Sequence, residues 1–92
     1  ASVPATRAAP VTHTITIEGT RFSPETLTVA RGDRVVWKNN DPFPHTATAK
    51  SKAFDSGNIK ANGAWRWTAA RTGTFDYLCT LHPTMKGVLV VQ

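Results

Sequence analysis

The sequence predicts an all-β fold, a Greek-key β-sandwich of seven or eight strands. Three observations support this prediction. Apolar and polar residues alternate in several short runs, turn-forming residues separate these runs about every ten residues, and no segment has a helical period of useful length. Short alternating strands pack as two facing sheets, and Greek-key connections commonly join them. We therefore expect a sandwich whose neighbouring strands are antiparallel.

The N-terminal half contains three predicted strands after a short arm. Residues 1–10 lack any period and include two prolines, so we expect a flexible arm followed by a single domain over residues 11–92. Apolar residues then alternate with polar ones, mostly threonine, which is the period of a half-buried strand, and turn formers at 30–33 interrupt a later run. The predicted strands of this half are 11–17, 27–29 and 34–38.

The C-terminal half alternates predicted strands with irregular segments. Turn formers fill residues 39–44 and place His45 at the far end of a loop. Residues 46–49 can form a strand, whereas residues 50–58 have no clear period and are expected to be irregular, with a short helical turn. A loop is expected over residues 80–87. The remaining predicted strands are 65–68, 74–79 and 88–92.

The chain of 92 residues has room for one domain, and its single cysteine, Cys79, excludes an internal disulfide. No apolar run approaches the ~20 residues that a membrane-spanning helix needs. The sequence opens with small residues and without Met, which is typical of a mature form after removal of a secretory signal. We therefore expect a periplasmic or otherwise exported protein.

The charge balance favours acidic partners. The formal net charge is +5 and the isoelectric point is about 10.0. The eleven Lys and Arg residues are scattered, with no block of five or more, and no nucleic-acid-binding signature occurs. We therefore expect a partner with an acidic surface and not a nucleic acid.

The most informative motif places three potential metal ligands at every third position, at Cys79, His82 and Met85. In a tight loop, a step of three residues can bring side chains back to one side. Thiolate and thioether are soft ligands, imidazole is intermediate, and Met is an unusual ligand for zinc. The set therefore favours copper, and two His with one Cys and a long axial Met is the arrangement of blue-copper electron-transfer sites.

The second histidine of such a site must come from another segment. His45 closes a proline-rich loop after a predicted strand, and it can lie at the same end of a sandwich as the loop that follows Cys79. His13 lies inside an alternating strand among β-branched residues. We expect His13 to have a structural or solvated role.

Residues 73–91, GTFDYLCTLHPTMKGVLVV, resemble the C-terminal copper loop and last strand of the cupredoxins. The short Cys-x-x-His-x-x-Met spacing is similar to that of amicyanin-like proteins, and plastocyanin-like proteins share the general pattern. The upstream segments that also resemble the family are 22–25, 29–37 and 44–45. Together these motifs span nearly the whole chain from Val11, so the resemblance is specific.

The resemblance implies a cupredoxin-like sandwich that holds one copper ion, cycling between Cu(I) and Cu(II). The copper ligands that it implies are His45, Cys79, His82 and Met85. It also implies a soluble one-electron carrier, not an enzyme, which shuttles electrons between periplasmic redox proteins. The expected partners have acidic docking surfaces, such as a c-type cytochrome or a periplasmic dehydrogenase or oxidase, and we expect a monomer.

The resemblance further implies that an edge of His82 reaches the surface within an apolar ring. The residues that can form this ring are Pro42, Phe43, Pro44, Leu81 and Pro83, and the nearby basic residues are Lys50, Lys52 and Lys86.

Two residues next to the implied ligands depart from the family pattern. Thr46 stands where relatives commonly have Asn, a residue that links the two ligand loops, and its hydroxyl can replace that link in part through the region of Thr80. Leu81 stands where amicyanin-like loops have Pro. Unlike Pro, Leu81 has a backbone N–H that can point at the Cys79 sulfur.

Other classes of protein remain open at this point. A module for copper storage or delivery could use the same ligands. A copper enzyme domain would need an additional histidine cluster, which three histidines do not supply. An adhesion sandwich without metal is the remaining class, and it would bind no stoichiometric copper.

Overall fold

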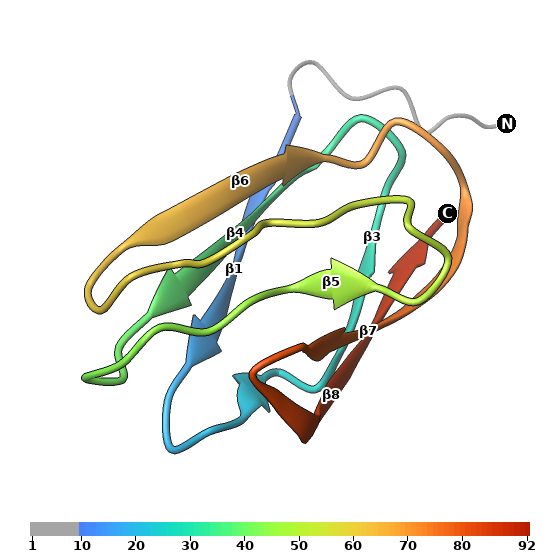
Figure 1. Ribbon diagram of the computed structural model, residues 1–92. Helices are drawn as coiled ribbons and strands as arrows, with labels where there is room; N and C mark the ends of the chain where they lie inside the picture. The colour runs from blue at the N-terminus through green and yellow to red at the C-terminus, as the bar shows by residue number, and fades with distance from the viewer. Residues whose placement is uncertain (1–9) are drawn as a thin grey trace, which may run out of the picture.

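The computed structural model describes residues 10–92, which form eight β-strands and no helix (Figure 1). The strands are β1 (Thr12–Ile17), β2 (Phe22–Ser23), β3 (Thr26–Val29), β4 (Arg34–Asn39), β5 (Thr48–Ala49), β6 (Ala64–Thr68), β7 (Gly73–Cys79) and β8 (His82–Val91). The all-β prediction is confirmed. Within the described residues, no helix is long and apolar enough to cross a membrane. The predicted arm falls almost entirely on residues 1–9, outside the described residues.

The strands form two four-stranded sheets that face each other (Figure 1). One sheet has the order β2-β1-β4-β6 and the other has the order β3-β8-β7-β5. The expectation of purely antiparallel sheets is wrong, because β1 pairs with β4 and β3 pairs with β8 in parallel register. These parallel pairs arise because strands that are adjacent in a sheet are not consecutive in the chain, and such order cannot be inferred from local alternation.

The core lies between the sheets and is rich in aromatic side chains. Trp37 and Tyr77, one from each sheet, are fully buried and meet edge to face, with ring centroids 5.6 Å apart. Phe54 reaches the same cluster from the irregular segment between β5 and β6. Such contacts contribute about 0.5–1.5 kcal/mol each beyond the burial of their area. These aromatic contacts therefore help to stabilise the core of a chain that has no disulfide.

The Tyr77 ring lies against the backbone of Gly87, its partner in the β7–β8 ladder. A Cβ atom at residue 87 would lie 2.4 Å from Tyr77 Cζ, so only glycine fits there. The missing side chain at Gly87 thus makes room for Tyr77.

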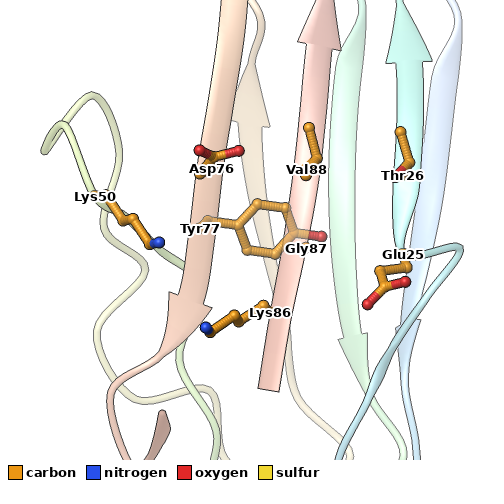
Figure 2. A pocket seen from close by; sticks show the side chains of 8 residues that line it. All are labelled: Glu25, Thr26, Lys50, Asp76, Tyr77, Lys86, Gly87 and Val88. Atoms are coloured by element: carbon orange, nitrogen blue, oxygen red, sulfur yellow. The ribbon is translucent and has the colours of Figure 1, made fainter. Parts of the chain in front are cut away.

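On the outer face of these strands, a hollow of about 280 Å³ is bordered by charged side chains, among them Lys50, Asp76 and Lys86 (Figure 2).

The end of the sandwich where β4 begins is fastened by Asp33, which is fully buried. Its Oδ1 accepts a hydrogen bond from the Val11 N–H, and its Oδ2 accepts one from the Ala30 N–H. His13 Nε2 lies 2.9 Å from Asp33 Oδ2. His13 therefore has a structural role, as expected.

The C-terminal hairpin differs from the predicted loop over 80–87. Cys79 pairs with His82 across a two-residue turn, and Leu78 pairs with Lys86. Residues 83–85 therefore have no partner on β7 and form a bulge within the hairpin. Pro83 lacks the N–H that a ladder needs, which favours a bulge here. The strand thus begins at His82, six residues earlier than predicted.

Two smaller differences concern other segments. The short strand β2 was not predicted, because two residues are too few to show a period. Residues 50–58 are irregular, as expected, but the helical turn is absent there. Instead, isolated bridges pair Thr48 with Asp55 and His45 with Ile59, so the backbone of this segment fastens it to the loop that carries His45.

Candidate metal centre

The sequence-predicted metal ligands lie beyond the end of β4 and at the turn of the β7–β8 hairpin. His45 follows the loop after β4, Cys79 ends β7, His82 begins β8, and Met85 lies in the bulge. Both segments are held at their bases by sheet pairing, and the His45 backbone bonds in both directions with Ile59. Two segments far apart in sequence are thereby held at one end of the sandwich.

The ligand atoms of His45, Cys79 and His82 all lie within 4.8 Å of one another. Cys79 Sγ is 3.6 Å from His45 Nδ1. His45 and Cys79 are fully buried, whereas His82 is half-buried. A thiol and two imidazoles thus share one small space near the surface.

The Nδ1 atom of His82 is buried and has no hydrogen-bond partner among the described residues. A buried polar atom without a partner costs free energy, and native structures rarely tolerate one without a reason. A metal ion bound at this nitrogen would remove that cost. The unpartnered His82 nitrogen and the donor set of one thiol and two imidazoles are both suited to binding a soft or borderline metal ion.

Met85 is 3% exposed and belongs to the same buried cluster as Cys79. Its position in the bulge, where no β7 residue opposes it, separates it from the regular ladder. The thioether is therefore kept out of water on the ligand-bearing hairpin.

Thr46 links the two ligand-bearing segments. Its Oγ1 accepts a hydrogen bond from the Thr80 N–H at 2.8 Å and lies 3.2 Å from Thr80 Oγ1. The Thr48 hydroxyl continues the network to the Asp55 carboxylate. The contact between Thr46 and the region of Thr80, expected from the sequence, is therefore present.

The sulfur of Cys79 accepts a hydrogen bond from the Thr46 N–H at 3.3 Å. This donor could not be predicted from the sequence, because the contact joins residues that are distant in the chain. Leu81 lies in the turn between Cys79 and His82 and is 47% exposed. The expectation that its N–H also points at the sulfur stays a prediction.

Asp41, which was not predicted to belong to the site, is buried behind His45. Asp41 Oδ2 lies 2.7 Å from His45 Nε2, on the side of the ring away from Cys79. Burial acts to raise the pKa of Asp41, but hydrogen bonds from the Thr20 N–H, the His45 ring and the Gly19 N–H outweigh it and lower the pKa. The sequence signal that could have revealed this contact is an aspartate four positions before His45, in the spacing Asp-x-x-x-His.

Apolar side chains cover the outside of the site. Phe43 is 39% exposed, and its ring centroid is 5.1 Å from that of His45 and 5.7 Å from that of His82. Leu81 is exposed on the neighbouring turn. The basic residues Lys50, Lys52 and Lys86 are all exposed.

Comparisons with known proteins agree with this architecture. The Cupredoxin-like domain family matches residues 1–91. Amicyanin-alpha of Methylorubrum extorquens is 31% identical over 77 residues, which cover 78% of this chain and 65% of that protein. Plastocyanin A/B of Petroselinum crispum is 32% identical over 92 residues, which cover 80% of this chain and 90% of that protein. The chain thus spans less than two thirds of Amicyanin-alpha.

Solved structures give the same result. A variant of amicyanin with Cu(I) has a TM-score of 0.81 at 28% identity, over 96% of this chain and 86% of that one. A copper-containing nitrite reductase from Thermus scotoductus has a TM-score of 0.84 at 26% identity, over 100% of this chain but only 25% of the reductase chain. The resemblance predicted from the sequence is confirmed, and the chain belongs to the cupredoxin-like family.

Proposed function

We propose that this protein is a one-electron carrier whose cofactor is a single copper ion held by His45, Cys79, His82 and Met85. The observation that carries the proposal is the convergence of one thiol and two imidazoles within 4.8 Å. One imidazole nitrogen, His82 Nδ1, is buried and has no hydrogen-bond partner within residues 10–92. When bound, copper would supply a reversible couple between Cu(I) and Cu(II).

The chain's own contribution is to keep its ligands in place during electron transfer. Movement of ligands between oxidation states would add to the barrier for transfer. Sheet pairing and the Thr46–Thr80 link restrict that movement, and burial of His45 and Cys79 excludes water. These features support an electron carrier over a storage or delivery module, because ligands that are this buried are poorly placed to exchange a metal ion.

The partial exposure of His82 supports the proposal that redox partners dock beside this residue. It is half-buried, while His45 and Cys79 are fully buried, and the exposed Phe43 and Leu81 lie beside it. A small apolar patch suits the brief encounters of redox proteins. We further propose that basic residues around the patch select partners with acidic surfaces, and that the protein is exported and acts as a monomer.

The relation to a copper-containing nitrite reductase raises the question of enzymatic activity. Among residues 10–92, only one group of three or more potential metal-ligating residues is present. His13 is engaged with Asp33 at the other end of β4. We propose one-electron transfer, and not enzymatic catalysis, as the role of this group.

A copper titration tests this proposal. Addition of Cu(II) to the purified protein should give stoichiometric binding and an intense blue colour that ascorbate bleaches reversibly. Cys79→Ala should abolish the colour, whereas His13→Ala, which removes a histidine outside the site, should keep it. Met85→Ala should remain coloured with a changed potential.

Two other results of the copper titration would contradict the proposed electron carrier. Exchangeable Cu(I) binding without a reversible one-electron couple would instead indicate copper storage or delivery. Absence of stoichiometric copper would overturn the proposal.

A further inference from the structure

The turn between β1 and β2 has an unusual backbone and contacts the loop that leads to His45. Gly19 and Thr20 both have left-handed backbone angles, with φ values of 63° and 55°. This conformation is uncommon for a β-branched residue such as threonine and persists only where other contacts stabilise it. The turn is closed by a hydrogen bond from the Glu18 N–H to the Arg21 carbonyl.

Both left-handed residues donate their amides to the same carboxylate. The Gly19 N–H lies 2.7 Å from Asp41 Oδ1, and the Thr20 N–H lies 3.0 Å from Asp41 Oδ2. Two adjacent amides that point at one anion form a small anion-binding concavity. The turn therefore holds the Asp41 carboxylate from one side.

The loop that carries Asp41 is fixed from the other side by Asn39. The Asp41 N–H donates to Asn39 Oδ1 at 2.9 Å. Asn39 Nδ2 donates to the carbonyls of Phe43 and Ile59, each at 2.9 Å. Because Asn39 is fully buried, these contacts leave the loop little freedom. The carboxylate can therefore act as a fixed acceptor.

Asp41 Oδ2 lies 2.7 Å from His45 Nε2, and a carboxylate that accepts a hydrogen bond there requires a proton on Nε2. The other nitrogen, Nδ1, faces the Cys79 sulfur at 3.6 Å and then has a free lone pair. A carboxylate behind a metal-binding histidine both orients the ring and makes it a stronger donor.

From this chain of contacts we infer that Asp41 is a positioning residue of the metal centre, which fixes His45 in the Nε2–H tautomer and lowers the reduction potential of the site. The inference rests on the proposed function for its effect on potential, but not for its effect on the tautomer. A full negative charge in a buried location favours the more positive oxidation state. Loss of that charge should therefore raise the potential.

A purely structural role for Asp41 predicts something different. If the carboxylate only fastened the β1–β2 turn, its loss would change the free energy of unfolding and leave the His45 ring and the potential unchanged. The ring tautomer and the potential therefore separate the two roles.

The test compares Asp41→Asn and Asp41→Ala with wild type and with Glu18→Gln. Glu18 is an exposed carboxylate on the same turn, so Glu18→Gln removes an equal charge without contact with the site. Nitrogen NMR of the metal-free proteins should show His45 in the Nε2–H form in wild type and in Glu18→Gln. In Asp41→Ala, which lacks an acceptor, the two tautomers should mix.

The copper-loaded proteins provide the second measurement. Asp41→Asn should shift the ratio of Cu(II) to Cu(I) affinity about tenfold toward Cu(I), which is about 59 mV higher for a one-electron couple. Glu18→Gln should change the potential much less. Asp41→Glu, which keeps the charge, should lie closer to wild type than Asp41→Asn, and it serves if the amide variant does not fold.

The outcomes separate this inference from the proposed function. A reversible copper couple in wild type, together with an unchanged tautomer in Asp41→Ala and an unchanged potential in Asp41→Asn, would overturn the inference and leave the function standing. Failure of wild type to bind copper would overturn the function, and the tautomer in the metal-free proteins would then decide the inference about positioning.

Discussion

Thr46 contacts the ligand-bearing hairpin twice, since its N–H lies 3.3 Å from Cys79 Sγ and its hydroxyl oxygen accepts the Thr80 N–H at 2.8 Å. One residue therefore links the loop of His45 to the strand of Cys79 through both its backbone and its side chain. Its neighbour His45 is a proposed ligand, so movement of either segment affects both sides of the site.

We expect Thr46→Val to destabilise the metal-free protein by about 1–3 kcal/mol, because the Thr80 N–H loses its acceptor while the backbone contact with Cys79 remains. Urea unfolding measures this change. Thr68→Val on the exposed edge strand β6 is the control and should change stability by less than about 0.5 kcal/mol. Equal stability of Thr46→Val and wild type would show that the link carries no net energy.

Leu81→Pro removes the N–H that we expect to point at the Cys79 sulfur. A donor to the thiolate disfavours Cu(II), so the proline variant should have a lower reduction potential. If that hydrogen bond differs by about 1 kcal/mol between oxidation states, the change is ~40 mV. Cyclic voltammetry measures it, and Leu81→Ala, which keeps the N–H, should match wild type. An unchanged or higher potential in Leu81→Pro would contradict the prediction.

Gly87→Ala should destabilise the protein by about 1–3 kcal/mol, because the new methyl group would lie 2.4 Å from Tyr77 Cζ and 2.5 Å from its hydroxyl oxygen. Chemical unfolding of the metal-free variant measures the loss. The same substitution in a Tyr77→Ala background has no ring to displace and should cost little. A full cost in that background would mean that the ring is not the cause.

Tyr77 is the only tyrosine in the chain, so its titration can be followed by the near-ultraviolet absorbance of tyrosinate. Burial raises its pKa from 10.0 to about 12, while Trp37 beside it opposes the shift and Glu25 adds to it. The folded protein should therefore titrate near pH 12, and the denatured protein near pH 10.

The sign of the effect on stability follows from the same shift. The folded state holds the phenolic proton more tightly, so the stability contributed by Tyr77 is full below pH 10 and is lost as the pH rises toward 12. Tyr77→Phe should reduce this loss in unfolding measurements above pH 10. A midpoint near 10 in the native protein would contradict the buried position of the hydroxyl.

The sequence alone determined the fold class and the proposed ligands, because both depend on local patterns. Alternation along residues 11–17 indicates a strand wherever its partner lies. The spacing of Cys79, His82 and Met85 indicates a soft metal before any geometry is known. Local sequence context also distinguishes His45, which follows a predicted loop, from His13, which lies in a predicted strand.

Only the tertiary structure decided which side chains support that site. The Thr46 donor to Cys79 spans 33 residues, and the amides that hold Asp41 are 21 and 22 residues away from it. Such contacts depend on strand order and on parallel pairing, which alternation does not encode. The proposed ligands can thus be predicted from the local sequence, whereas the hydrogen bonds that orient them form only when distant segments meet.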